Sequence, residues 1–211
     1  RAAEDAADEV AMLAATRGGR EPWEIFITDA MTNRRLLSNR WPQGLKSHGR
    51  IEFTATPGEY ESATFAIYAV NALEDVELEI SDLTMGGEAL DASVIEPWVV
   101  QCWYQAGLGI ADIGQRILVP ELLLKDDDLV RVDYEKQRNY VRAAAGSRQY
   151  LDVSTETSKH LEDLYPQDAD TLQPVDIAAR RLKQFWLTAH VPEDAAAGTY
   201  SGTIAVTAGD G

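Results

Sequence analysis

The segment Phe185-Trp186-Leu187-Thr188-Ala189-His190-Val191 alternates between apolar side chains and more polar or amphipathic ones. Phe185, Leu187, Ala189 and Val191 occupy every second position in it. An apolar side chain at every second position is typical of a β-strand that buries one of its faces. In an amphipathic helix the apolar side chains recur every three or four residues instead. The segment therefore predicts a half-buried strand.

The same alternation, or an apolar run of strand length, recurs through most of the chain. Strands are expected at residues 23–27, 51–56, 63–69, 76–80, 94–104, 117–124, 129–133 and 200–207. Turn signals such as Pro57-Gly58 and Gly86-Gly87 separate them. Many short strands with such turns, and without helices between them, predict a two-sheet antiparallel β-sandwich.

Two segments outside this pattern favour short helices. Residues 2–15 are rich in alanine, carry acids in the first turns, and are followed by Gly18-Gly19, which would end a helix. Residues 158–165 precede a proline and predict a small helical insertion. We therefore expect a mainly β chain with a short N-terminal helix and small helical insertions. Residues 1–20 are expected to form a helix or linker, and residues 21–211 the β-sandwich domain.

The charge of the chain excludes several classes of partner. Its 211 residues include 19 basic and 35 acidic side chains, which gives a net charge of -16. Residues 51–115 carry no lysine or arginine, whereas residues 29–49 form a long basic loop. Nucleic-acid affinity depends mainly on phosphate neutralisation by basic side chains, so we expect no nucleic-acid partner. The longest uncharged stretches are shorter than the roughly 20 apolar residues of a membrane span, so we expect no membrane insertion.

Few residues suggest catalysis or metal binding. The chain has no glycine-rich phosphate loop and no Gly-x-Ser-x-Gly motif. Cys102 lies inside an apolar run and is interpreted as a buried structural thiol, and His190 as a structural histidine. Asp126-Asp127-Asp128 offers oxygen ligands for calcium, but a solvated turn is the favoured interpretation. We expect no catalytic residue, no metal and no cofactor.

Four aromatic residues are the candidate site. Alternation places Trp98 and Tyr104 on one face of the predicted strand 94–104 and Trp103 on the other. Trp186 lies on the opposite face to its neighbours in the 185–191 segment. Exposed aromatic rings of this kind either stack on sugar rings or pack against another domain. Both interpretations stay open, and Trp103 and Trp186 are the best-placed residues for either.

Three segments together resemble a known family. They are Thr56-Pro57-Gly58-Glu59-Tyr60-Glu61-Ser62-Ala63-Thr64-Phe65-Ala66, Leu118-Val119-Pro120-Glu121-Leu122-Leu123-Leu124-Lys125-Asp126-Asp127, and the region from Gln184 to Ile204 with its Val191-Pro192-Glu193-Asp194 turn. In this order they are similar to the N-terminal β-sandwich domain of bacterial glycoside hydrolase family 123-like proteins and related uncharacterised families. The resemblance covers residues 50–208.

In that family a catalytic TIM-like barrel follows the sandwich. An adjacent Asp-Glu pair in the barrel assists attack by the substrate's own acetamido group. The Asp-Glu dipeptide of this chain, Asp8-Glu9, lies outside the matched region, so no catalytic residue is carried over. The resemblance implies that this segment alone is not an enzyme and that the protein to which it belongs is a glycoside hydrolase.

The expected role is thus that of a non-catalytic domain that supports a downstream catalytic barrel of the same chain and contributes to its substrate cleft. One alternative is an autonomous carbohydrate-binding module, for which the partner is a glycan. Another is a cell-surface sandwich that binds protein. The resemblance, together with an acidic, lysine-poor composition, implies a secreted, periplasmic or cell-surface bacterial protein. We expect the chain to be one domain of a longer protein.

Overall fold

The computed structural model describes residues 22–45, 49–106, 114–154, 162 and 164–209. Within these residues the chain is mainly β, as the sequence predicts, and its strands pair in antiparallel fashion. The strands are β1 (Trp23–Thr28), β2 (Tyr60–Ala69), β3 (Leu73–Ile80), β4 (Leu83–Met85), β5 (Glu88–Leu90), β6 (Ile95–Ala106), β7 (Arg116–Leu124), β8 (Val130–Asp133), β9 (Arg138–Arg142), β10 (Tyr150–Asp152), β11 (Val175–Ile177), β12 (Arg181–His190) and β13 (Ile204–Gly209). Two short 3-10 helices are η1 (Ala92–Val94) and η2 (Asp127–Leu129).

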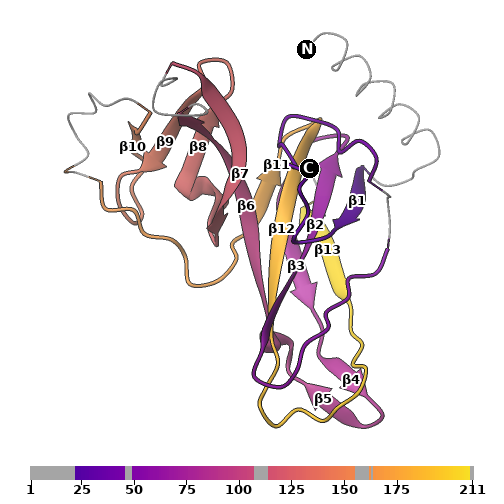
Figure 1. The fold of residues 1–211 in the computed structure, drawn as a ribbon. Helices are drawn as coiled ribbons and strands as arrows, with labels where there is room; N and C mark the ends of the chain where they lie inside the picture. Colours follow the sequence, from indigo (N-terminus) through magenta and orange to yellow (C-terminus); the bar gives the residue numbers. More distant parts are fainter. Residues whose placement is uncertain (1–21, 46–48, 107–113, 155–161, 163, 210–211) are drawn as a thin grey trace.

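Two sheets form the β-sandwich (Figure 1). The larger sheet has the strand order β1-β2-β12-β6-β7, and the smaller has the order β11-β3-β13. One apolar core contains buried residues from both sheets, among them the fully buried Phe185. Phe65 and Phe185 stack with their ring centroids 5.2 Å apart, and Val76 and Ile177 enter the same core from the smaller sheet. We call the side of the five-stranded sheet that faces this core the inner face.

The opposite side, the outer face, is also covered at one end. The loop that follows β1 crosses it and inserts Trp41, whose ring meets Phe26 and Tyr68 edge to face at centroid distances of 5.2 and 4.7 Å. This second apolar cluster also includes Leu36, Leu45, Ala66 and Leu182. Burial on both faces explains why residues 63–69 of β2 are all buried, although only every second residue faces the main core.

A separate lobe contains the three-stranded sheet β10-β9-β8, and β6 and β7 extend from the sandwich towards it (Figure 1). Side-chain amides join the two parts. The Tyr104 backbone N–H donates to Asn139 Oδ1 at 2.8 Å, and Asn139 Nδ2 donates to the Tyr104 carbonyl at 2.6 Å. Gln101 Nε2 donates to the Val130 carbonyl at 2.9 Å. These bonds join the end of β6 that extends beyond its ladder with β12 to the small lobe.

Most of the expected strands are present, but two expectations are wrong in part. Residues 51–56 form no strand, although Ile51 and Phe53 pack against the core. Their alternation reflects burial of every second side chain, while no neighbouring strand supplies a ladder. The last strand begins at Ile204 rather than at Tyr200. The expected helix at 2–15 lies outside the described residues, as does most of 158–165. In the described part of the chain, no helix has the length and apolarity needed to cross a membrane.

Candidate functional site

At its other end the outer face, which the described residues leave partly open there, carries a strip of aromatic and polar side chains. The central strand β12 fixes it, because Trp186 lies opposite Trp98 of β6 and opposite Thr64 of β2. Directly paired residues of an antiparallel ladder project to the same side of the sheet. The next rows along β12 extend the strip towards the end of the strand. We call this surface the outer strip: Tyr60, Ser62, Glu96, Trp98, Trp186, Thr188 and His190.

Trp98 lies under a buried cation. The Lys125 ammonium is 3.6 Å from the centroid of the Trp98 ring, and the lysine is only 4% exposed. Lys125 Nζ donates to the Pro97 carbonyl at 2.7 Å and pairs with Glu96 Oε1 at 2.9 Å. A desolvated cation over an indole contributes about 2 kcal/mol of attraction. One face of the Trp98 ring is therefore occupied by the chain itself.

Two exposed rings form the end of the outer strip. Tyr60 and His190 stack with their ring centroids 4.1 Å apart and their planes within 3° of parallel. Tyr60 is 67% exposed. Between this pair and the tryptophans lie the Ser62 and Thr188 side chains, which are cross-strand partners. The outer strip thus combines stacked rings, two hydroxyls and, next to them, the Glu96 carboxylate.

A backbone clasp holds the end of the strip. Gly58 N–H donates to the Val191 carbonyl at 2.8 Å, and Val191 N–H donates to the Glu59 carbonyl at 3.0 Å. Gly58 adopts a φ of 82°, which favours glycine. Glu59 Oε2 accepts the Thr56 backbone N–H at 2.8 Å, and this hydrogen bond lowers the pKa of the Glu59 carboxyl below its usual value of 4.5. The Pro57-Gly58 turn is therefore tied to the end of β12.

Trp103 does not belong to the outer strip. Alternation along β6 places it on the opposite face from Trp98, as the sequence predicts, and its Nε1 donates to Glu121 Oε2 at 2.6 Å. Glu121 is the extra residue of a β-bulge, because Gln101 pairs with Leu122 while Cys102 pairs with Pro120. The Gln105 side chain donates to the same carboxylate.

Tyr104 lies near the small lobe. Its hydroxyl donates to the Tyr134 carbonyl at 3.5 Å, and its backbone bonds to Asn139. Of the four predicted aromatic residues, the structure therefore brings Trp98 and Trp186 together. Trp103 and Tyr104 lie elsewhere on β6.

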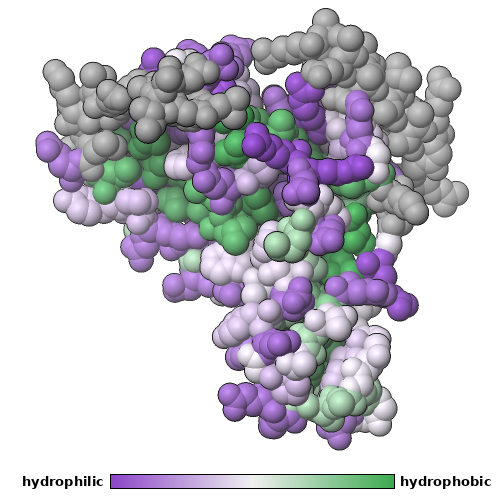
Figure 2. All heavy atoms as spheres, in the orientation of Figure 1, coloured by the Kyte–Doolittle hydropathy of each residue, from purple (hydrophilic) through white to green (hydrophobic). Residues whose placement is uncertain are grey.

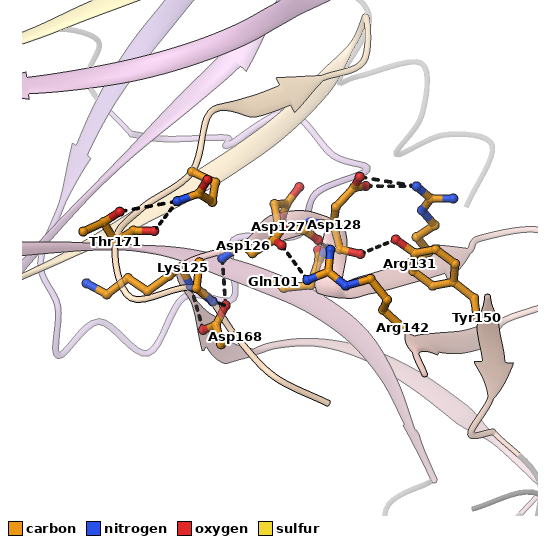
Figure 3. Close-up of polar contacts among 12 residues, drawn as sticks. Gln101, Lys125, Asp126, Asp127, Asp128, Arg131, Arg142, Tyr150, Asp168 and Thr171 are labelled. Carbon is orange, nitrogen blue, oxygen red and sulfur yellow. Dashed lines mark hydrogen bonds and ion pairs between the residues drawn. The ribbon is translucent and has the colours of Figure 1, made fainter. Parts of the chain in front are cut away.

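The acidic turn Asp126–Asp128 is a junction between the sandwich and the small lobe (Figure 3). Each carboxylate has its own cation: Asp126 binds Arg142 Nη2 at 2.6 Å, Asp127 binds Lys183 Nζ at 2.6 Å, and Asp128 binds Arg131 Nη2 at 3.3 Å. The three carboxylates thus diverge towards different partners. Among the described residues there is no group of three or more acidic, histidine or cysteine side chains that could hold a metal ion.

Asp168 fixes the start of this turn. Its carboxylate accepts the backbone N–H groups of Lys125 and Asp126, both at 2.8 Å (Figure 3). The hydrogen bond that Arg142 donates to the Asp126 carboxylate raises the pKa of the Arg142 guanidinium, which therefore stays charged. Because Lys125 is held at its backbone by Asp168, its side chain is directed onto Trp98 from a fixed position.

The sequence alone did not single out Lys125, Tyr60 or Glu96. Lys125 is one of five lysines and directly follows the apolar run Leu122–Leu124, which was the available signal. Its contact with Trp98 could not be predicted from the sequence, because that contact depends on the register between β6 and β7. Cys102 is buried, as the sequence predicts, and its thiol lies 3.5 Å from the Leu36 carbonyl. Burial raises the pKa of the Cys102 thiol.

Comparison with known proteins assigns the chain to no family. No protein-family model matches the chain, and no curated protein sequence matches it. One solved structure that overlaps with it is a family 123 glycoside hydrolase from Clostridium perfringens, described in a study of glycolipid glycan hydrolysis. The overlap has a TM-score of 0.42 and 13% sequence identity, and covers 74% of this chain and 19% of that one. A likeness at this level does not establish a family.

Proposed function

We propose that the chain is a non-catalytic β-sandwich domain of a carbohydrate-active enzyme, and that its outer strip packs against a catalytic barrel of the same protein, beside the substrate cleft. The segments that carry the sequence resemblance support this proposal through their placement. They supply β2, β7 and β12, three strands of the one five-stranded sheet. The first and third of them are joined by the clasp between Gly58 and Val191.

The observation that carries the proposal is the pair of half-buried tryptophans, Trp98 and Trp186, on a sheet face that the described part of the chain leaves partly open. A ring that stacks on a sugar needs an exposed flat face, whereas both tryptophans are half-buried and Lys125 occupies one face of Trp98. Half-buried aromatic residues surrounded by polar groups are instead typical of the core of a protein–protein interface. We therefore favour domain docking for these two residues.

The experiment compares the whole protein with the isolated chain. The isolated chain should not hydrolyse aryl glycosides of 2-acetamido sugars, and the whole protein should. Trp186→Ala in the whole protein should lower turnover or the cooperativity of unfolding, because the barrel loses its support. Trp103→Ala, on the opposite face, is the matched control and should leave both unchanged. Equal effects of the two substitutions would contradict the proposal.

A second candidate function, an autonomous carbohydrate-binding module, is favoured by one specific feature. The Tyr60 ring is largely exposed, and the hydroxyls of Ser62 and Thr188 lie one row further along the strip. A stacking ring with neighbouring hydroxyls is suited to a sugar. Binding of the isolated chain to a glycan array, lost in Tyr60→Ala, would support this function over docking.

We also propose that the parent protein is secreted, periplasmic or on the cell surface.

A further inference from the structure

The loop over the outer face borders a half-open cavity of about 380 Å³. Its walls include Arg34, Arg35 and Arg40, and its apolar surfaces include Trp41, Pro42 and Leu182. A volume of this size lies at the lower end of the range for small-molecule sites, which is about 300–1,000 Å³. The cavity therefore has room for one small ligand.

The loop that forms this cavity is anchored to the sheet. Leu182 N–H of β12 donates to the Ser38 carbonyl at 2.9 Å, and the Ser38 hydroxyl is 2.8 Å from the Tyr134 hydroxyl. Trp41 is held between Phe26 and Tyr68. Arg34 Nη1 donates to the Gln43 carbonyl at 3.0 Å, which positions its guanidinium at the wall. The cavity is thus built on fixed contacts.

The charge of the cavity is opposite to that of the chain. The chain has a net charge of -16, yet none of the described residues that line the cavity is acidic. Arg35 is exposed and makes no ion pair with any residue in the described part of the chain. Figure 2 shows strongly hydrophilic side chains gathered where this loop crosses the upper parts of β12 and β2. Guanidinium groups recognise planar carboxylates and sulfates through paired hydrogen bonds.

We infer that this cavity binds a saccharide unit that carries a carboxylate or sulfate group. The Arg35 guanidinium would take the anionic group, and the half-buried Trp41 side chain would lie against the ring. The assignment to a saccharide rests on the proposed function. It is supported by position, because Leu182 of the cavity and Trp186 of the outer strip lie on the same face of β12, four residues apart. At about 3.3 Å per residue this is about 13 Å along the strand, so the cavity adjoins the proposed domain seam.

The test uses the 211-residue chain and titration with four probes: D-glucuronate, glucose 6-sulfate, neutral glucose and inorganic sulfate. Binding is followed by the NMR signal of the Trp41 indole N–H. The two acidic sugars should bind at this site, and glucose and inorganic sulfate at least about tenfold more weakly, because each lacks half of the recognised chemistry. Arg35→Gln should weaken binding of the acidic sugars about tenfold. The matched control is Arg50→Gln, because the Arg50 side chain is 83% exposed and does not line the cavity.

Equal affinity for glucose and glucuronate, or equal loss in the Arg35 and Arg50 variants, would overturn the inference. Inorganic sulfate binding as tightly as the acidic sugars would overturn the assignment to a saccharide. The outcome is separable from that of the proposed function, because Trp186 does not line the cavity. Absence of acidic-sugar binding with an intact effect of Trp186→Ala would overturn the cavity assignment alone. Binding of the acidic sugars without any effect of Trp186→Ala would uphold the cavity assignment and overturn the docking proposal.

Discussion

Trp98 and Trp186 lie directly opposite each other in the ladder between β6 and β12, on the outer face of the five-stranded sheet. Their neighbours in the sequence, Val99 and Phe185, point to the inner face and are fully buried in the main core. The same two strands therefore separate a structural face from a face that is available to a partner. This division is the basis of the functional proposal.

The two faces predict different costs for removing neighbouring aromatic side chains. Trp186→Ala should lower the free energy of unfolding by about 1–2 kcal/mol, because the ring is half-buried and mainly loses its cross-strand contact. Phe185→Ala should cost about 3–5 kcal/mol, because the ring is fully buried and stacks on Phe65. Urea unfolding of both variants measures this. A loss above about 3 kcal/mol for Trp186→Ala would make it a core residue and contradict the account.

The acidic turn predicts a second contrast. Asp127→Asn should destabilise the chain by about 3 kcal/mol, because it leaves the buried Lys183 ammonium without its counter-charge. Asp128→Asn is the matched control one residue away. The Asp128 side chain is 68% exposed and that of its partner Arg131 is 56% exposed. The loss in free energy of unfolding should therefore be below about 1 kcal/mol. Equal losses in thermal or urea unfolding would mean that the turn is not the junction described here.

Calcium should not stabilise the chain, because the three carboxylates of the turn each bind a different cation. Micromolar calcium should leave the Tm unchanged relative to a chelator. Sodium chloride should raise the Tm between low and moderate concentration, because the chain carries a net charge of -16 and salt screens the repulsion. A rise in Tm with micromolar calcium that disappears in Asp126→Asn would reveal a metal site at the turn.

The clasp predicts a pH dependence. The pKa of Glu59 is lowered in the folded chain, chiefly by the hydrogen bond from the Thr56 backbone N–H. Its stabilising contribution is therefore full above the usual value of 4.5 and is lost as the pH falls through the lower folded value. Wild type should have a higher Tm than Glu59→Gln at pH 7, and the difference should shrink below pH 4.5. A difference in Tm that stays constant down to pH 3 would show that the charge of Glu59 has no part in the clasp.

The sequence predicted the strands whose alternation coincides with pairing, such as 63–69 and 185–191. Residues 51–56 show that alternation reports burial and not a ladder, because Ile51 and Phe53 are partly buried without a strand partner. Alternation also placed Trp98 and Trp103 correctly on opposite faces of β6, because the direction of side chains along one strand is a local property.

Pairing between strands could not be predicted from the sequence. That Trp186 lies opposite Trp98 depends on the register between β12 and β6, whose paired residues are more than 80 positions apart in sequence. The contact of Lys125 with Trp98 depends in addition on a third strand and on Asp168. Such non-local contacts follow from the tertiary fold, and no local pattern encodes them.

The central claim is that the outer strip is covered by another domain of the same protein. Hydroxyl-radical footprinting tests it most directly, by comparing oxidation of individual side chains in the isolated chain and in the whole protein. Trp186 and Tyr60 should be oxidised several-fold more slowly in the whole protein, while Tyr165, which is 71% exposed and lies outside the strip, should react equally in both. Unchanged oxidation of Trp186 and Tyr60 in the whole protein would contradict the account.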